Sequence, residues 1–271
     1  MLSRILTFPV VRFAIRCVYR PYFARASGQK RLFLGVYPTF EAARSAAPHS
    51  KPTDYDDSGY AYVANHKFIH ASDYPILYWL SQLIPSCSSL ADFGGNVGMA
   101  YYSFRKYLHL RQEFRWVVYD LPHIIEAGKK VREVEENREQ LSFTSRVDEL
   151  DGAEIFFAAG ALQYVPEPLS TILSKFKHRP KHLLLNKLPV SPKGEYYTLQ
   201  NTGTAFCPYR VLHQTELAQN LRSLGYQVVD VWTNPDMPLR IPDAESYSLR
   251  AFSGMYFRLQ SSDQDQEDRV G

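Results

Sequence analysis

The sequence predicts an α/β protein built on a mostly parallel β-sheet with helices on both faces. After Pro85, short apolar runs alternate with helix-like segments, which is typical of such a sheet. A glycine-rich turn follows the first apolar run, at the place where α/β proteins bind nucleotides. The chain has 271 residues, of which 45% are hydrophobic and 22% are charged, and this composition supports one large core.

Residues 87–260 contain the sheet-forming part of the predicted fold. Apolar runs predict strands at 89–93, 116–119, 141–144, 154–159, 182–186, 227–232 and 254–259. Helical spacing of apolar residues predicts helices at 97–108, 123–137, 168–176 and 214–224. Two long irregular stretches, about 187–212 and 233–253, are predicted to be lids or substrate loops. The short, polar and acidic segment 261–271 is predicted to form a disordered tail.

The first 86 residues are predicted to form a basic amphipathic helix within 1–30 and a cap over 31–86. The region 1–40 has no acidic residue, and its basic residues are Arg4, Arg12, Arg16, Arg20, Arg25, Lys30 and Arg31. Arginines spaced four apart over 10–20 share one helical face, and Pro21 is expected to end the helix. Within the cap, we expect one helix begun by Thr39 and another over 74–83.

Two interpretations stay open for the N-terminal helix. It could lie on anionic lipid, giving a peripheral contact with the inner membrane through residues 1–22, or it could pack its apolar side on the body. We expect no membrane-spanning segment, because arginines interrupt the longest apolar stretch, and they also argue against a signal peptide. The three cysteines Cys17, Cys87 and Cys207 are far apart, which favours a cytoplasmic protein without disulfides.

Several function classes lack the residues that they need. The net charge is only +3, and its basic excess lies at the N-terminus, so the body is not expected to bind nucleic acid. No metal site is predicted, because His178 and His182 flank Pro180 and the pair His66 and His70 lacks a third ligand. No Gly-x-Ser-x-Gly elbow of a hydrolase occurs. The expected partner of the body is a small molecule.

The segment 90–98, Leu-Ala-Asp-Phe-Gly-Gly-Asn-Val-Gly, joins the first predicted strand to a helix. Its glycines allow a sharp turn and close approach of a ligand to the backbone. The carboxylate of Asp92 would repel a dinucleotide pyrophosphate but suits the cationic amino group of a methionine moiety. The segment also lacks the Gly-x-Gly-x-x-Gly and phosphate-loop patterns. These features favour S-adenosylmethionine over NAD as the cofactor.

The apolar strand 116–119 ends at Asp120, about 20 residues beyond the glycine turn. A nucleoside-binding sheet places there the carboxylate that accepts hydrogen bonds from ribose hydroxyls. The alternative is a carboxylate that caps a helix, because Leu121 and Pro122 indicate a helix start. Together with the glycine turn, the ribose role is preferred.

Three motifs in this order resemble those of a known family. They are Asp-Phe-Gly-Gly-Asn-Val-Gly at 92–98, Trp-Val-Val-Tyr-Asp-Leu-Pro at 116–122 and Leu-Gln-Tyr-Val-Pro-Glu-Pro at 162–168. The chain is similar over about 33–257 to class I S-adenosylmethionine-dependent methyltransferases associated with bacterial gene clusters for lipopolysaccharide and other surface polysaccharides. It departs from their pattern at Asp120-Leu121, at Asn186-Lys187-Leu188-Pro189 and at Asn65-His66.

The resemblance implies a Rossmann-like class I methyltransferase fold. Such a fold has a seven-stranded, mostly parallel sheet with an antiparallel last strand, here with an N-terminal helical cap. S-adenosylmethionine would lie over the carboxyl ends of the first strands, with Gln163 and Tyr164 near its sulfonium. The full set of residues that the resemblance assigns to the cofactor is Asp92, Phe93, Gly94, Gly95, Gly98, Asp120, Leu121, Gln163 and Tyr164.

Candidate catalytic residues lie at strand ends or in the two irregular stretches. His213 is a candidate general base, or else a residue at a helix start. Lys187 is a candidate for orienting an anionic substrate, or else an ordinary surface lysine. Tyr209 is a candidate for stacking on a sugar, or else a packed core residue.

These observations predict a cytoplasmic methyltransferase. By the resemblance, it would methylate an oxygen of a glycan or activated sugar during the biosynthesis of surface polysaccharides. An alternative is a non-catalytic protein that keeps the cofactor fold and acts as a membrane-peripheral adaptor. A nicotinamide-dependent oxidoreductase is disfavoured by Asp92.

Overall fold

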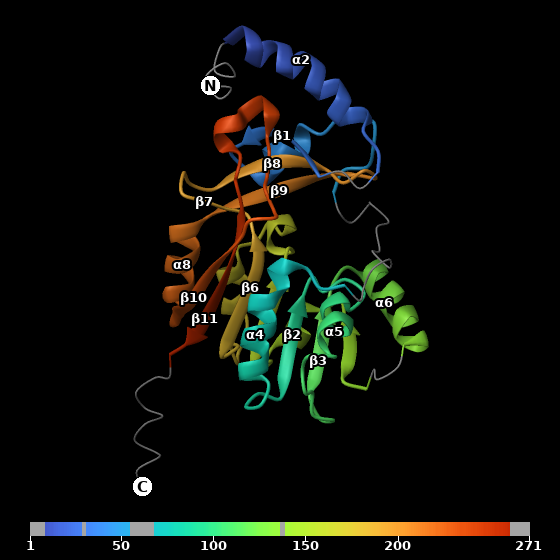
Figure 1. Ribbon diagram of the computed structural model, residues 1–271, viewed down its shortest axis with the longest axis vertical. Helices are drawn as coiled ribbons and strands as arrows, with labels where there is room; N and C mark the ends of the chain where they lie inside the picture. The colour runs from blue at the N-terminus through green and yellow to red at the C-terminus, as the bar shows by residue number, and fades with distance from the viewer. Residues whose placement is uncertain (1–8, 29–30, 55–67, 136–138, 261–271) are drawn as a thin grey trace.

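The computed structural model describes residues 9–28, 31–54, 68–135 and 139–260, which form two β-sheets and their helices (Figure 1). The large sheet has seven strands in the order β10-β11-β6-β5-β2-β3-β4. Its strands are β2 (Ser89–Phe93), β3 (Arg115–Tyr119), β4 (Leu141–Thr144), β5 (Ile155–Ala159), β6 (His182–Leu188), β10 (Tyr226–Asn234) and β11 (Phe252–Leu259). All seven strands that the sequence predicts are therefore confirmed.

Five strands of the large sheet run parallel, from β4 through β3, β2 and β5 to β6. The last strand of the chain, β11, is antiparallel to both of its neighbours, β6 and β10. Every residue of the inner strand β2 is buried, because helices cover both faces of the sheet. The predicted mostly parallel sheet with an antiparallel last strand is confirmed.

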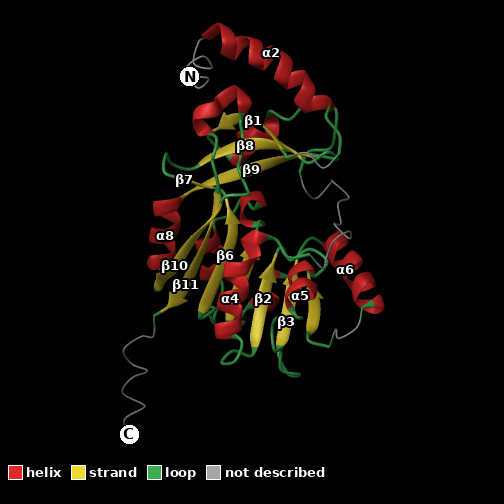
Figure 2. Ribbon diagram, viewed as in Figure 1, coloured by secondary structure: helices red, strands yellow, loops and turns green. Residues whose placement is uncertain are grey.

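Helices cover the two faces of this sheet in separate layers (Figure 2). One layer contains α4 (Tyr74–Leu83), α5 (Met99–Phe104) and α6 (Pro122–Val134), whose apolar side chains share a single cluster with Leu90 and Trp116. The other contains α7 (Leu169–Ser174) and α8 (Gln214–Arg222), which pack with Phe156 and Leu183. The helix expected over 74–83 thus packs on the large sheet.

The small sheet has the order β1-β8-β9-β7 and stands over one end of the large sheet in Figure 1. Its strands are β1 (Leu32–Tyr37), β7 (Val190–Ser191), β8 (Tyr196–Asn201) and β9 (Phe206–His213). The prediction of an irregular loop over 187–212 is therefore wrong. All six residues of β8 are buried, so the strand shows no alternation, and Pro208 within β9 argues against a strand.

The second irregular stretch, 233–253, also packs on the small sheet. It contains the helical turn η5 (Pro242–Tyr247) and a bridge between Leu239 and Leu249. Leu239 and Ile241 are fully buried against Phe33 and Tyr209 of the small sheet. Apolar packing therefore orders this segment, whose own secondary structure is one helical turn and one β-bridge.

The N-terminal helix α2 (Pro9–Arg25) continues through Pro21, so the prediction that this proline ends the helix is wrong. The last turn of α2 is stabilised by a residue of β8. The side-chain amide of Asn201 donates hydrogen bonds to the carbonyl oxygens of Phe23 and Ala26, at 2.6 and 3.0 Å. Phe23 is fully buried and stacks on Phe206, with ring centroids 5.3 Å apart.

Of the two interpretations of this helix, packing on the body holds for its C-terminal half. The hydroxyl of Tyr19 donates a hydrogen bond to the carbonyl oxygen of Phe33, at 2.9 Å, while Val18 stays exposed. Within the described residues, no helix is both long and apolar enough to cross a membrane. After β1, Thr39 begins α3 (Phe40–Ser45) by accepting a hydrogen bond from the Ala42 N–H, as predicted.

Candidate active site

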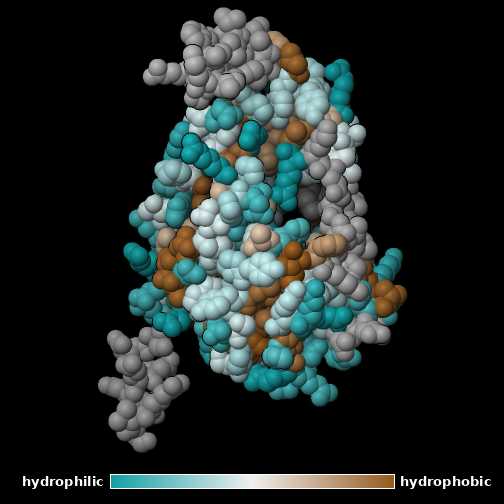
Figure 3. Space-filling model, viewed as in Figure 1, coloured by the Kyte–Doolittle hydropathy of each residue, from teal (hydrophilic) through white to brown (hydrophobic). Residues whose placement is uncertain are grey.

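A cleft of about 450 Å³ separates the carboxyl ends of the large sheet from the small sheet, and part of the hollow is visible in Figure 3. It lies where β2 and β5 meet. From β2 the chain goes on to β3 and β4 on one side, whereas β5 and β6 extend the sheet on the other. This reversal is the topological switch point at which open α/β sheets bind ligands. The volume suits a ligand of cofactor size.

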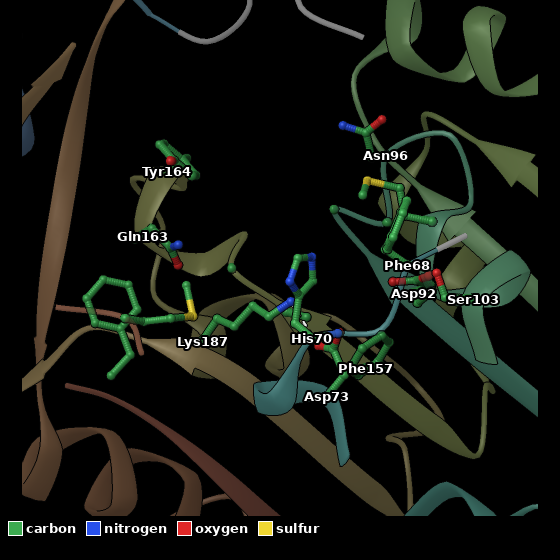
Figure 4. Close-up of a pocket in the computed structure, with 18 of the residues that line it drawn as sticks. Phe68, His70, Asp73, Asp92, Asn96, Ser103, Phe157, Gln163, Tyr164 and Lys187 are labelled. Atoms are coloured by element: carbon green, nitrogen blue, oxygen red, sulfur yellow. Dashed lines mark hydrogen bonds and ion pairs between the residues drawn. The ribbon is translucent and has the colours of Figure 1, made fainter. Parts of the chain in front are cut away.

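The cleft brings together predicted residues that are far apart in the sequence. Those that line it are Asp92, Gly94, Gly95, Gln163, Tyr164, Lys187 and Tyr209. Figure 4 shows that His70 and Lys187 lie between two walls. One wall carries Gln163 and Tyr164, and the other carries Asp92, Asn96 and Ser103.

The turn between β2 and α5 leaves no room for a side chain at Gly94 or Gly95. Gly94 has φ of 70°, and a Cβ on it would collide with the side chain of Ala161. A Cβ on Gly95 would lie 2.5 Å from Cγ of Asp92. Gly98 has φ of 88° and precedes the first residue of α5. The backbone of this turn therefore forms one wall of the cleft.

Asp92 lies beneath this turn and is only 2% exposed. Its Oδ2 accepts a hydrogen bond from Nε1–H of Trp116, at 3.0 Å. Burial raises the pKa of Asp92 to about 7, although the bond from Trp116 acts against this and the nearby Asp120 carboxylate adds to it. The cleft thus has at its floor a carboxyl group that no cation of the described residues neutralises.

Asp120 follows β3 and ties the glycine turn to the end of this strand. Its Oδ2 accepts a hydrogen bond from the Asn96 N–H and its Oδ1 accepts one from the Leu121 N–H, both at 2.8 Å. Burial raises the pKa of Asp120, while these two bonds lower it. Each carboxylate oxygen keeps a second lone pair for a ligand hydroxyl. Asp120 does not line the cleft, so its ribose role remains a prediction.

Three other predicted cofactor residues, Phe93, Gly98 and Leu121, lie beside the cleft and do not line it. Phe93 is 3% exposed and stacks on Tyr119, with ring centroids 4.9 Å apart, so its side chain belongs to the core. Gly98 forms the start of α5, and Leu121 precedes α6. Only their backbone is placed to shape the site.

Lys187 lies near the end of β6 and lines the cleft. Its φ is 54°, a left-handed conformation that is rare outside glycine. Its Nζ lies 2.9 Å from Oδ1 of Asp73, which is 5% exposed. The other oxygen of Asp73 accepts a hydrogen bond from the His70 N–H, at 3.0 Å. The segment 70–73 is therefore anchored to the end of β6.

Asn186 strengthens this anchor from inside the fold. It is fully buried, and its Nδ2 donates a hydrogen bond to the carbonyl oxygen of Ser72, at 2.8 Å. Its Oδ1 accepts bonds from Trp232 and Asn234, at 3.1 and 3.0 Å. Every polar atom of this amide is satisfied, which fixes the position of the segment that carries His70.

His70 is a site residue that the sequence analysis missed. It lines the cleft, and its imidazole points into the cleft in Figure 4. The sequence analysis considered His70 only as a metal ligand paired with His66, and set it aside because this pair lacks a third ligand. The one local signal was Asp73, three residues later, which closes a turn onto the His70 backbone. Nothing in the sequence placed this turn against β6.

An aromatic pair forms the wall toward the small sheet. The hydroxyl of Tyr164 donates a hydrogen bond to Oε1 of Gln200, at 2.7 Å, and the ring meets Tyr209 edge-on at 5.2 Å. Tyr209 also packs edge-on against Phe33 and is 2% exposed, which agrees with a packed core tyrosine whose rim reaches the cleft. Oε1 of Gln163 is buried and has no hydrogen-bond partner among the described residues.

The structure does not bring His213 into this cleft. His213 precedes α8, and it lines a separate hollow of about 220 Å³. Its Nδ1 lies 3.2 Å from Oε1 of Glu216 in the first turn of α8. This position corresponds to the alternative of a residue at a helix start, and we assign His213 no role in the chemistry of the cleft.

Replacing Lys187 by methionine should lower the free energy of unfolding by about 1–3 kcal/mol, because Asp73 would stay buried without its cation. The Lys187 side chain is 21% exposed, so the loss should be smaller than for a fully buried pair. Lys175→Met is the control, since its pair with Glu167 is exposed on both sides. Urea unfolding measures both, and equal losses would contradict the prediction.

No family model and no curated protein matches this sequence. Several solved structures resemble its fold. One is proposed to be a sarcosine dimethylglycine methyltransferase from Galdieria sulphuraria; it has 10% identity and a TM-score of 0.51, over 77% of this chain and 99% of that one. Another, from Listeria monocytogenes, is proposed to be an S-adenosylmethionine-dependent methyltransferase, with 12% identity and a TM-score of 0.50 over 70% and 99% of the chains. This is the class I methyltransferase fold.

The strand order of the large sheet agrees with that fold. A 1,6-didemethyltoxoflavin N1-methyltransferase from Burkholderia thailandensis also matches, with 18% identity and a TM-score of 0.46 over 70% of this chain and 79% of that chain. Within the class I methyltransferase fold, the cleft of this protein lies at the carboxyl ends of the parallel strands. The small sheet, which combines β1 near the N-terminus with β7, β8 and β9 from residues 190–213, forms the opposite wall.

Proposed function

We propose that this protein transfers a methyl group from S-adenosylmethionine to a small molecule bound in the cleft. The observation that carries the proposal is the buried carboxyl group of Asp92 beneath the glycine turn at the switch point. It is suited to the cationic amino group of a methionine moiety, whereas a pyrophosphate would be repelled. When bound, the cofactor supplies an electrophilic methyl group on a sulfonium.

The residues of the cleft fit such a cofactor. A ligand can approach the backbone closely at Gly94 and Gly95, because neither residue carries a side chain. A Cβ at these positions would collide with Ala161 or Asp92. Asp120, which lies beside the cleft and accepts a hydrogen bond from the Asn96 N–H, has free lone pairs for ribose hydroxyls. The buried Oε1 of Gln163 needs a hydrogen-bond donor that a ligand in the cleft could provide.

For the chemistry, we propose His70 as the general base. Its imidazole points into the cleft between the cofactor wall and the aromatic wall. In this role, His70 would accept the proton of the acceptor hydroxyl as that oxygen is methylated. Alignment of the two ligands supplies the remaining acceleration.

His70→Gln should lower kcat by about 10²- to 10³-fold, because the acceptor hydroxyl would lose its base. The affinity for S-adenosylhomocysteine should stay within about threefold, since His70 is not assigned to the cofactor. His109→Gln, an exposed histidine outside the cleft, is the control. An unchanged kcat in His70→Gln would remove His70 from the mechanism.

For the acceptor, we propose an oxygen of a glycan or activated sugar in the biosynthesis of a surface polysaccharide in the cytoplasm. The support is the sequence resemblance of the segments 92–98, 116–122 and 162–168. The alternative of a non-catalytic adaptor predicts cofactor binding without turnover of any acceptor. Methyl transfer from radiolabelled S-adenosylmethionine to sugars and sugar nucleotides separates the two.

Calorimetric titration of S-adenosylhomocysteine into the whole protein tests the cofactor first. We expect a dissociation constant near micromolar, which corresponds to about −8 kcal/mol, and no binding of NAD. Binding of NAD in preference to S-adenosylhomocysteine would replace the proposal with an oxidoreductase. Binding of neither would refute the assignment of this cleft to a nucleoside cofactor.

A further inference from the structure

The wall of the cleft formed by the small sheet contains one charged group among the described residues. Arg31 directly precedes β1 and is exposed in the cleft. Its guanidinium forms no ion pair or hydrogen bond within the part of the chain that the structure describes. The other cleft residues on this side are Gln200 and Tyr209 of the small sheet and, beside them, Tyr164, Thr202, Met237 and Phe252.

The other charged side chains that line the cleft are Asp73, Asp92 and Lys187, and none of them forms an ion pair with Arg31. Lys187 and Asp73 form their own ion pair, at 2.9 Å. Asp92 is buried beneath the glycine turn, where it bonds to Trp116. The role in orienting an anion, predicted for Lys187, is thus weakened by its partner, whereas Arg31 retains its full charge.

Arg31 also lies near the aromatic pair. Burial raises the pKa of both Tyr164 and Tyr209, and the positive charge of Arg31 opposes this rise at each phenol. These rings, together with Phe252 and Met237, offer an apolar surface to a ligand whose charged end would face the guanidinium. A guanidinium binds carboxylate and phosphate groups through paired hydrogen bonds.

We propose that the methyl acceptor is an anion, carrying a carboxylate or a phosphate that Arg31 binds on the small-sheet side of the cleft. This inference rests on the proposed function, in which the cofactor occupies the opposite wall. It narrows the acceptor to molecules with an anionic group at one end and a nucleophilic oxygen directed toward His70. A neutral glycan would leave Arg31 without a partner inside the cleft.

The experiment uses the whole protein saturated with S-adenosylhomocysteine at constant ionic strength. Calorimetry measures the binding of phenyl phosphate, benzoate and neutral benzyl alcohol. We expect at least one of the two anions to bind in the millimolar range and the alcohol to bind at least tenfold more weakly. The stronger of the two anions shows whether phosphate or carboxylate is the preferred group.

The variants are Arg31→Gln, Arg31→Lys and, as a matched control, Arg240→Gln, an exposed arginine outside the cleft. Arg31→Gln should weaken anion binding at least tenfold, or about 1.4 kcal/mol, while leaving the affinity for S-adenosylhomocysteine unchanged. Arg31→Lys should lose less, because it keeps the charge but not the paired hydrogen bonds. The control should match the wild type.

Three results would overturn the inference. The first is no anion binding to the wild-type complex, and the second is equal binding in wild type and Arg31→Gln. The third is a parallel loss of S-adenosylhomocysteine affinity in Arg31→Gln, which would assign Arg31 to the cofactor. Failure of the wild type to bind S-adenosylhomocysteine is a separate outcome, because it refutes the proposed function itself and with it the basis of this inference.

Discussion

Gly95→Ala should weaken the binding of S-adenosylhomocysteine at least 100-fold, or about 2.7 kcal/mol. The added Cβ would lie 2.5 Å from Cγ of Asp92, a distance that real side chains do not tolerate. Asp92 would have to move, which breaks its hydrogen bond to Trp116 and removes the carboxylate from the floor of the cleft. The same strain should lower the free energy of unfolding by about 1–3 kcal/mol.

Calorimetry measures the affinity of this variant, and thermal unfolding shows that it is folded at the temperature used. Gly152→Ala is the control, because Gly152 has φ of 82° but open space around the position of a Cβ. It should lose stability through backbone strain and keep the affinity of the wild type. Wild-type affinity in a folded Gly95→Ala protein would show that the cofactor does not use this turn.

The second large effect concerns protons. Burial raises the pKa of Asp92 to about 7, so the folded protein without ligand keeps a proton there that the unfolded chain loses near pH 4. The stability due to this proton is present in acid and falls as the pH rises from about 4 to about 7. A cationic amino group bound beside Asp92 would favour the ionised form. Binding should therefore release the proton below pH 7, and affinity should rise toward pH 7.

Titration of S-adenosylhomocysteine at pH 6 in two buffers with different ionisation enthalpies counts the protons released. We expect close to one proton for the wild type and none for Asp92→Asn, which keeps an oxygen for the hydrogen bond from Trp116. Asp92→Asn should also bind at least tenfold more weakly above pH 7. Asp148→Asn, an exposed carboxylate, is the control. The same proton release in Asp92→Asn would assign it to another group.

The parallel sheet could be predicted because its determinants are local. Each strand is a short apolar run bounded by turn residues, and the helix-like segments between them force a parallel arrangement. β2 and β4 have the predicted bounds, and β11 begins two residues earlier than predicted. The glycine turn could be located for the same reason, since its backbone conformation at Gly94 and Gly98 depends on residue type.

The small sheet could not be predicted in this way. Its first strand, β1, pairs with β8, more than 160 residues later in the chain, through partners such as Phe33 and Gln200. β8 is buried on both faces, including its polar residues Thr198, Gln200 and Asn201, so its sequence has no alternation of apolar and polar side chains that would predict a strand. The continuation of α2 past Pro21 could not be predicted, because its last turn is stabilised by a hydrogen bond from Asn201, which lies far away in the sequence.

By itself, the sequence determined the seven-stranded sheet and the turn at 92–98, because residue type and periodicity act over a few neighbours. Only the tertiary structure decided which charged groups share the cleft. It paired Lys187 with Asp73, placed His70 in the cleft and His213 outside it, and left Arg31 unpaired on the opposite wall. The reason is that the role of a charged side chain depends on the groups within a few ångströms of it. In this protein, those neighbours come from strands and turns that only the packing of the two sheets brings together.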